Sequence, residues 1–380
     1  MKRKGYLFER VADIDNLRTA FCKARKRKSA KTDILEFSRN LDANLSRIRR
    51  ELLDGTYRFG AYSYFDIHDP KRRVICAASF PERVIHHAIM NICAEHFENY
   101  QIPYSYARRK NKGTFAALER AARCQRKYQW HLKLDVRKYF DSISHEILYG
   151  KMERMYKDRK LLDVFRRIID SYHARDGKGV PIGNLTSQYF ANHYLSFADR
   201  YAVEKLRIPA YVRYMDDMFM WANNGGELRE KGALFEKFIV ENLGLSLKPF
   251  VLNRTKHGLS ALGFILYPNA IRLNQRSRER FSVKLTEYMA LMYRGEMRET
   301  EFSRRVLAIY GFIARADARG FAGKILRNWV ERHGLEPGES GRELEQRREE
   351  RAGFESQQQR SRQSQQQYWF PPGPQLKTAD

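Results

Sequence analysis

Apolar residues at helical spacing mark the first third of the chain. One face of residues 33–53 is apolar, and Asp33 and Glu36 precede it like a capping pair, so this segment is predicted to be one amphipathic helix. The apolar positions are Leu41, Leu45, Ile48 and Leu52. A second helix is predicted to begin at Pro81, because proline suits the first helical turn, and a third covers residues 114–126. The second helix is expected to bury Val84, Ile85, Ala88, Ile89 and Ile92.

The spacing of apolar residues changes between Tyr128 and Val136. Apolar side chains alternate there with Gln129, His131, Lys133 and Asp135. Such alternation is typical of a half-buried strand. Because alternate side chains of a strand face opposite sides of the sheet, Asp135 is predicted to lie on the polar face, open to a cleft.

A hairpin is predicted over residues 210–222. Two short apolar runs lie on either side of Asp216 and Asp217, so the turn between them would display two carboxylates. A helix is expected to follow over roughly Leu228–Leu243. Together these segments predict an α+β fold with an antiparallel sheet.

The remaining segments complete the predicted order. Short strands are expected near residues 245–247 and 262–267, and residues 275–333 return to a basic helical pattern. From Pro337 onward Glu, Arg, Ser and Gln dominate. This composition predicts a flexible tail over residues 335–380, since it cannot bury enough apolar surface to order itself.

Charge points to a polyanionic partner. The 380 residues include 71 Lys and Arg against 45 Asp and Glu, a formal net charge of +26. The four cysteines are widely separated without a CxxC pair, which predicts neither a disulfide framework nor a zinc site. We find no signal-peptide pattern and no apolar run long enough to span a bilayer, so the expected compartment is the cytoplasm, without membrane attachment.

The aspartates carry the candidate chemistry. Phosphoryl and nucleotidyl transfer use two divalent ions that are held chiefly by carboxylate oxygens. Asp135 on a strand, with Asp216 and Asp217 on a turn, supplies carboxylates from two separate elements. An Asp-Asp turn taken alone is more often a plain surface turn, so its flanking residues decide the interpretation.

Those flanking residues resemble the catalytic motifs of reverse transcriptases. The run Tyr214-Met-Asp-Asp217 between apolar stretches resembles their Y-x-D-D hairpin, and residues 134–143 (LDVRKYFDSI) resemble their first catalytic motif. The resemblance implies that two Mg²⁺ ions, or Mn²⁺ as a substitute, are bound by Asp135, the Val136 backbone, Asp216 and Asp217. It also implies that Phe140 lies beneath the nucleotide sugar and excludes a 2′-hydroxyl.

Further motifs follow in the family's order. Residues 71–84 resemble the basic fingers segment, in which Arg73 and Arg83 would meet the incoming triphosphate and the template. Residues 103–114 are similar to the next fingers motif, and residues 262–264 to the strand that grips the primer end. Three cations are candidates for the group that protonates pyrophosphate, and the sequence does not choose among them: Lys248, Arg254 and Lys256.

The resemblance implies a right-hand polymerase fold. Fingers and N-terminal helices would occupy residues 1–127, and the palm residues 128–268, with a helical part at about 145–200. A helical thumb would follow at residues 269–334. The implied partners are template RNA, the cDNA/RNA duplex and deoxynucleoside triphosphates.

The segment between the aspartate motifs resembles one particular group of reverse transcriptases. Ile182-Gly183-x-x-x-Ser187-Gln188 looks like the variant found in reverse transcriptases of diversity-generating retroelements, which copy a template RNA with errors at adenines for mutagenic retrohoming. Gly183 would permit close backbone approach to the nascent base pair, and Gln188 would offer amide contacts. The plainer alternative is that Ser187 and Gln188 merely cap a helix. Such enzymes, bacterial or phage-encoded, imply a small basic oligomeric accessory protein as a partner.

Three other functional hypotheses are compatible with the sequence. The chain fits a group II intron, retron or phage-defence reverse transcriptase, or a catalytically idle RNA-binding relative that keeps the fold and the basic groove. The sequence Gly225-Gly226-Glu227 near a carboxylate turn also suggests a palm-fold nucleotide cyclase, but these residues follow the hairpin instead of forming it.

Overall fold

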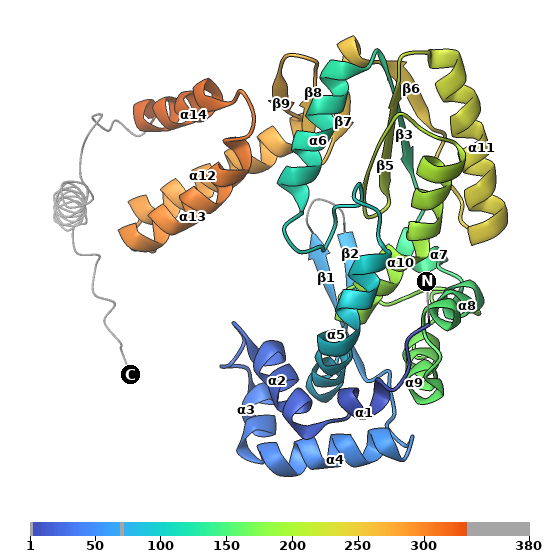
Figure 1. Cartoon of the computed structure of the whole chain (residues 1–380). Coiled ribbons are helices and arrows are strands. Elements are labelled where there is room, and N and C mark those ends of the chain that lie inside the picture. Colours follow the sequence, from blue (N-terminus) through green and yellow to red (C-terminus); the bar gives the residue numbers. More distant parts are fainter. Residues whose placement is uncertain (1–2, 69–71, 333–380) are drawn as a thin grey trace, which may run out of the picture. The chain divides into compact units, whose positions relative to one another are not determined.

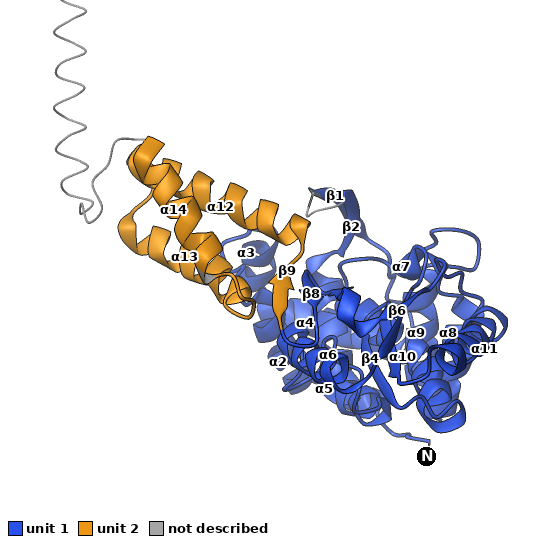
Figure 2. Cartoon of the chain, turned by 90° about the horizontal axis from the view of Figure 1, so that it is seen from above, with its two compact units in different colours: residues 1–269 blue, residues 270–380 orange. Residues whose placement is uncertain are grey.

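The computed structural model describes residues 3–68 and 72–332 (Figure 1). The chain forms two compact units, residues 1–269 and 270–380 (Figure 2). Both units are rich in helices, and the strands of the first pair in antiparallel fashion. The α+β class predicted from the sequence is therefore confirmed.

The first unit opens with helices. They are α1 (Phe8–Val11), α2 (Ile14–Arg25), α3 (Thr32–Arg39), α4 (Leu41–Leu53) and α5 (Phe80–Tyr100). The single helix predicted over residues 33–53 is wrong, because Asn40 leaves the helical region with φ −121° and ψ 47° and separates α3 from α4. The predicted capping pair is wrong too. Asp33 lies inside the first turn of α3, where its carboxylate accepts a hydrogen bond from Arg83 at 2.8 Å.

The start of α5 agrees with the prediction to within one residue. Pro81 lies in the first turn, where its missing N–H costs nothing. Of the residues predicted to face inward, Ile92 is only partly buried. The fully buried ones are Val84, Ile85, Ala88 and Ile89.

An antiparallel hairpin that the sequence did not predict precedes α5. Its strands are β1 (Tyr62–His68) and β2 (Arg72–Ala78), with Ser63 opposite Ala77. Most of β1 and the first half of β2 are exposed, and burial alternates only over the end of β2. Without alternation over most of its length, the segment carries no period-2 signal.

The central sheet carries the candidate catalytic residues. Its strand order is β4-β5-β3-β6, and neighbouring strands pair in antiparallel fashion. The strands are β3 (Trp130–Asp135), β4 (Ala210–Tyr214), β5 (Asp217–Ala222) and β6 (Val251–Arg254). The predicted strand and hairpin are both confirmed. His131, however, lies on the face of β3 that was predicted to be polar and is nevertheless buried. Gln125 of helix α6 (Thr114–Lys127) contacts its ring.

Helices surround this sheet. They are α6 (Thr114–Lys127), α7 (Tyr139–Ser142), α8 (His145–Met155), α9 (Arg159–Asp170), α10 (Leu185–Arg200), a π-helical turn (Tyr201–Lys205) and α11 (Gly225–Leu243). Helix α11 lies against β3, where a Cβ at Gly232 would come within 2.5 Å of Leu132. Gly225, Gly226 and Glu227 form the first turn of α11, with the Asn224 side chain capping it.

The end of the first unit departs from the prediction. Residues 245–247 form no regular strand and make a single bridge between Leu247 and Val136. The strand expected at 262–267 begins later, because Leu262 and Gly263 occupy a turn with φ of +53° and +91°. The elements here are a 3-10 turn (Thr255–His257), β7 (Leu259–Ala261) and β8 (Phe264–Leu266).

The second unit is mainly helical, as predicted. It contains β9 (Ile271–Leu273), α12 (Gln275–Tyr293), α13 (Glu299–Ile313) and α14 (Arg319–Arg332). The Asn274 side chain caps α12 by accepting from the Ser277 N–H at 2.8 Å. The tail predicted over 335–380 lies outside the described residues. Among the described helices, none has the length and apolar character needed to cross a membrane.

Candidate active site

Strand register brings the three predicted aspartates together. Asp135 at the end of β3 lies directly opposite Asp217 at the start of β5. Met215 and Asp216 form the two-residue loop between β4 and β5, so Asp216 adjoins the same strand end. Two carboxylates from a turn and one from a neighbouring strand thus share one edge of the sheet.

Electrostatics couple these carboxylates. Burial, reinforced by the charges of Asp217 and Asp135, raises the pKa of Asp216 to about 6. The Arg73 guanidinium opposes this rise, so Arg73 on β2 lies close enough to act on the carboxylate cluster. Burial also raises the pKa of Asp217, against the influence of Lys133. Burial therefore makes ionisation of both aspartates less favourable than in water.

Two lysines contact the cluster directly. The Lys248 ammonium lies 2.5 Å from Oδ2 of Asp135, and the Lys133 ammonium 3.7 Å from Oδ1 of Asp217. Of the three cations left open by the sequence, the structure brings Lys248 to the aspartates. Arg254 instead lies over the Trp130 ring at 5.2 Å, and Lys256 belongs to the 3-10 turn.

The donor set suits hard divalent cations. Within the described residues, no three His, Cys, Asp or Glu side chains are already arranged as a metal cage. Mg²⁺ in phosphoryl-transfer sites is usually held by one or two carboxylates, with substrate phosphates and water completing its shell, so a full protein cage is not required. Burial, followed by the neighbouring carboxylates, raises the pKa of Asp216, and a bound cation would favour its ionised form.

The Val136 backbone lies beside this donor set. The hydrogen bonds that flank it run from the Lys248 N–H to the Asp135 carbonyl and from the Arg137 N–H to the Ser246 carbonyl. The Val136 carbonyl oxygen accepts neither of these two hydrogen bonds.

A buried ion pair lies beneath the aspartate turn. Arg213 of β4 is fully buried and donates to both carboxylate oxygens of Asp199 on α10, each at 2.7 Å. The same guanidinium donates to the Met215 carbonyl at 3.1 Å, and the Tyr211 hydroxyl donates to Asp199 at 2.8 Å. Met215 needs such support, since its φ of +53° is unfavourable for a residue other than glycine. Sequence reasoning missed this pair, although a charged residue inside an apolar strand was the available signal.

Phe140 lies on the helical turn α7, next to the Asp135 segment. Its ring is partly buried and meets Tyr139 edge-on at 5.7 Å. Tyr139 is fixed by donating to the Ala191 carbonyl at 2.5 Å, and the Phe140 carbonyl accepts from the Val180 N–H at 3.0 Å. The helical turn that carries Phe140 is therefore attached to both α10 and the loop before it.

The loop at residues 182–184 packs onto β2. The Ile182 carbonyl accepts from the Cys76 N–H at 2.8 Å, and the Asn184 side chain accepts from the Ala78 N–H at 3.1 Å. Gly183 has φ +124°, and a Cβ there would lie 2.7 Å from Ile75 Cγ2. The close approach that Gly183 permits is thus to strand β2.

The helix-capping alternative for Ser187 and Gln188 is wrong. Helix α10 begins at Leu185 after Asn184, so Ser187 lies within its first turn and is buried, whereas Gln188 is partly exposed.

Arg83 is one of the residues predicted to meet the incoming triphosphate and the template. Its guanidinium pairs with Asp33 at 2.8 Å, a contact within the N-terminal helices.

Comparison with known proteins places these residues in one family. The family described as reverse transcriptase (RNA-dependent DNA polymerase) matches residues 68–266, just over half of the chain. The group II intron-encoded protein LtrA of Lactococcus lactis subsp. cremoris is 24% identical over 173 residues, covering 43% of this chain and 29% of its own. A COX1/OXI3 intron 1 protein of Saccharomyces cerevisiae is 21% identical over 174 residues, covering 43% and 21%.

A solved structure is similar as well. It is that of telomerase from Candida albicans in complex with a TWJ fragment of telomeric RNA, with 14% sequence identity and a TM-score of 0.46 over 72% of this chain and 57% of that one. The present chain spans less than a third of the length of the curated relatives named above.

Proposed function

The chain belongs to the reverse transcriptase (RNA-dependent DNA polymerase) family, and from this premise we propose that it is a Mg²⁺-dependent enzyme that makes cDNA on a template RNA. The single observation that carries the proposal is the register of Asp135 opposite Asp217, with Asp216 in the adjoining turn. This arrangement offers carboxylates from two strands at one sheet edge, which is what two-metal nucleotidyl transfer requires.

In this proposal Asp135, Asp216 and the Val136 carbonyl hold the ions, and Asp217 supports the turn and the local field. Two bound Mg²⁺ ions would polarise the reacting phosphate and stabilise the attacking and leaving oxygens. Lys248, paired with Asp135 at 2.5 Å, is the cation best located to give a proton to the departing pyrophosphate.

Substrate selection rests on two residues in this proposal. Phe140, fixed between α10 and the loop before it, excludes a 2′-hydroxyl and so favours deoxynucleotides over ribonucleotides. Arg73 contacts the triphosphate or template phosphates, a role supported by its influence on Asp216 and by the fit of guanidinium to phosphate. Arg83 keeps a proposed template contact only if its pair with Asp33 opens.

We infer further that the enzyme serves mutagenic retrohoming in a diversity-generating retroelement. The support is the Ile182-Gly183-x-x-x-Ser187-Gln188 sequence, whose first two residues belong to a loop held against β2. Gln188 would contact the nascent base pair, and the altered pocket would tolerate mispairs at template adenines. A small basic oligomeric accessory protein would then assist in holding the template RNA.

A second candidate is a group II intron reverse transcriptase. The observation that favours it is the similarity to the group II intron-encoded protein LtrA. The two candidates share the polymerase chemistry and differ in template and fidelity.

One experiment tests both levels of the proposal. The wild type and Asp216→Ala are given a defined RNA, a primer, Mg²⁺ and deoxynucleotides, with and without a neighbouring small basic protein, and the products are sequenced. Synthesis by the wild type alone supports the polymerase. Errors clustered at template adenines support the retroelement, whereas accurate cDNA favours the intron enzyme. Absence of cDNA under all priming conditions would support an idle RNA-binding relative.

A further inference from the structure

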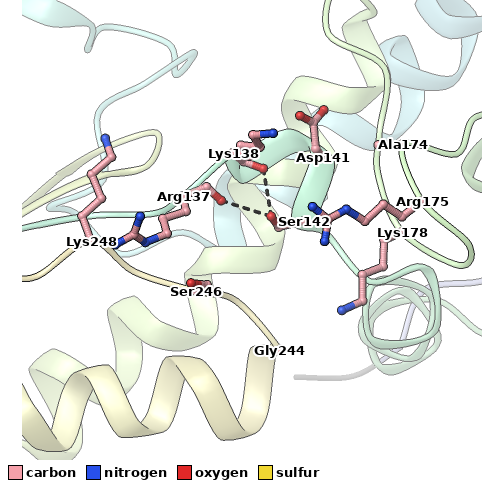
Figure 3. Close-up of a pocket in the computed structure, with 10 residues that line it drawn as sticks. All are labelled: Arg137, Lys138, Asp141, Ser142, Ala174, Arg175, Lys178, Gly244, Ser246 and Lys248. Atoms are coloured by element: carbon pink, nitrogen blue, oxygen red, sulfur yellow. Dashed lines mark hydrogen bonds between the residues drawn. The ribbon is translucent and has the colours of Figure 1, made fainter.

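Two pockets of the molecule differ in the side chains that line them. The larger, basic pocket adjoins the candidate active site through Lys248, and its cations come from three segments of the chain (Figure 3). These cations are Arg137, Lys138, Arg175, Lys178 and Lys248. The other pocket lies in the second unit, between α12 and α13, and is lined mainly by apolar side chains. No residue of this α12–α13 groove takes part in the proposed chemistry.

The α12–α13 groove has room for about one aromatic ring. Its volume is about 190 Å³, and a dry apolar cavity of about 150 Å³ is already enough to bind benzene. Phe281 at the groove is buried, and its ring centre lies 6.0 Å from that of Phe321 on α14, so α14 supports this wall. The apolar lining consists of Phe281, Ala308, Ile309, Phe312 and Ile313.

Helix α13 has little cover for the apolar residues that it carries. Of its seven large apolar or aromatic side chains, only Ile313 is buried. Leu307 is 69% exposed and Tyr310 38%. A helix with a broad apolar face normally buries that face against a neighbour, and an exposed apolar patch marks an interaction surface. Within the described residues, much of this face of α13 stays exposed beside the groove.

The chain itself contains a segment that suits the groove. Residues 356–367 are Ser, Gln and Arg alone, and the run Tyr368-Trp-Phe-Pro-Pro372 follows them. Trp and Tyr are the usual anchors of binding interfaces, and proline-rich segments dock in aromatic-lined grooves. Arg280 and Lys284 of α12 also line the groove, and cations of this kind attract the faces of aromatic rings.

Chain length and charge both favour this occupant. Residues 333–368, which separate α14 from Trp369, span up to about 120 Å when extended, whereas α12 with its 19 residues is about 28 Å long. Residues 333–355 contain seven Glu and four Arg, and residues 270–332 contain fourteen Lys and Arg against seven Asp and Glu. The acidic stretch is therefore attracted to the basic helices that form the groove.

We propose that the α12–α13 groove binds the chain's own aromatic segment, residues 368–370, with the Trp369 ring in the pocket. Because the segment is tethered, its binding is intramolecular, and a modest affinity is enough to keep the groove occupied. A nucleic-acid duplex suits the groove less, since it presents rows of phosphates and this lining is mainly apolar. The proposal does not depend on the polymerase chemistry.

Hydrogen exchange on the full chain tests whether the tethered segment occupies the groove. Backbone amides of residues 277–284 and 308–313 are expected to exchange faster in Trp369→Ala/Phe370→Ala than in the wild type, because the cover over both helices is lost. Phe354→Ala removes another aromatic residue of the same part of the chain and should match the wild type. Equal exchange in the wild type and the double variant overturns the proposal.

A labelled peptide of residues 364–374 tests the groove directly by fluorescence anisotropy. It is titrated, up to about 1 mM, into the full-length wild type and into Trp369→Ala/Phe370→Ala. We expect the double variant to bind the peptide about tenfold or more tightly than the wild type, in which the tethered segment competes. No binding by the double variant over this range overturns the proposal.

A matched pair of substitutions locates the peptide. Ala308→Glu, at an exposed position of the lining, is added to the double variant and should abolish binding, because a carboxylate is poorly accommodated against an apolar groove. Ala233→Glu, at an exposed position of α11, should change affinity by less than about twofold. Thermal melts check that both variants fold.

The other occupants give distinct results. Groove protection that appears only with an RNA/DNA duplex and is insensitive to Trp369→Ala/Phe370→Ala assigns the groove to nucleic acid. Protection that grows with protein concentration assigns it to a second copy of the chain. Either result, or peptide binding that Ala308→Glu leaves intact, overturns the proposal.

Discussion

At the scale of single residues, the candidate active site combines carboxylates that repel one another. Asp216 shows this most directly, since burial and the charges of Asp217 and Asp135 raise its pKa to about 6. A group whose pKa is raised on folding stabilises the protein at low pH, and this contribution is lost as the pH rises through the folded value. At neutral pH the charged Asp216 therefore opposes folding while serving the proposed chemistry.

Replacing Asp216 by Asn is expected to separate these two effects. Synthesis of cDNA should fall by about a hundredfold or more, because an interaction made at the reacting phosphate is lost. The melting temperature should rise at pH 8 and not at pH 4, since the amide removes a charge that is unfavourable only when ionised. Primer extension and thermal denaturation measure the two quantities, with Asp15→Asn at an exposed position of α2 as the control. A lower melting temperature at pH 8 would contradict the electrostatic account.

Gly183 gives a second residue-scale prediction. Gly183→Ala is expected to destabilise the fold by about 1–3 kcal/mol, because the methyl group meets Ile75 at 2.7 Å in a backbone region that alanine avoids. Gly113→Ala is the matched control, since Gly113 has a similar positive φ of +111° but nothing within 4 Å of the added Cβ. Urea unfolding compares them. Equal losses in both variants would mean that φ alone matters and that contact with β2 does not.

At the scale of elements, the β4–β5 hairpin depends on a buried ion pair. Arg213 joins Asp199 of α10 to the Met215 carbonyl, so the aspartate turn is held from below by a helix. Removing one member of a buried pair leaves an uncompensated charge, which costs more than the pair itself contributes. The pair therefore acts by positioning the turn and does not take part in the chemistry.

The expected consequence is strong coupling between the two residues. Arg213→Met and Asp199→Asn should each lower the free energy of unfolding by about 3–5 kcal/mol, and the double variant by less than the sum. In Arg213→Lys, which keeps a charge but loses the bidentate geometry, kcat should fall while RNA affinity is kept. A double-mutant cycle by urea unfolding measures the coupling, and strict additivity would refute it.

Helix α5 provides an element-scale prediction about pH. Glu82 is completely buried, accepts from the Gly60 N–H at 3.0 Å and lies 3.6 Å from His86. Burial raises the pKa of Glu82 to about 7 from 4.5, so its stabilising contribution is complete below pH 4.5 and is lost as the pH rises through about 7. Burial lowers the pKa of His86 to about 3, which favours a neutral pair.

Glu82→Gln should therefore remove a pH-dependent penalty. Relative to the wild type, the variant is expected to gain about 1–3 kcal/mol of unfolding free energy at pH 8 compared with pH 4.5. The titration of His86 is common to both proteins and largely cancels in the comparison. Urea unfolding at the two pH values measures the difference, and a constant difference across this range would show that Glu82 does not titrate on unfolding.

At the scale of the whole molecule, the net charge of +26 is the dominant property. Only a small part of it serves the three aspartates, through Arg73, Lys133 and Lys248. Many of the other cations are exposed, and binding of a polyanion by many distributed cations releases counterions and depends steeply on salt.

RNA affinity should accordingly be independent of the catalytic residues and sensitive to salt. We expect affinity for a template RNA to fall by about a hundredfold or more between about 50 and 200 mM salt. Asp216→Ala should show the same slope as the wild type, because no phosphate-binding cation is removed. Filter binding or fluorescence anisotropy across a salt series measures both. Loss of RNA binding in Asp216→Ala would instead indicate misfolding.

The sequence alone determined the elements that carry the aspartates. Alternation placed Asp135 at the end of a strand, and two apolar runs defined the hairpin around Asp216, because both patterns arise from backbone geometry over a few residues. It did not reveal the break at Asn40 or the exposed β1–β2 hairpin, where burial departs from a simple period.

Only the tertiary structure decided which distant groups meet. Lys248 reaches Asp135 across 113 residues of chain, Gly183 lies against β2, and the basic pocket draws its cations from three segments. Local periodicity cannot specify such contacts, since each depends on how separate elements pack and on which side chains the packing leaves facing one another.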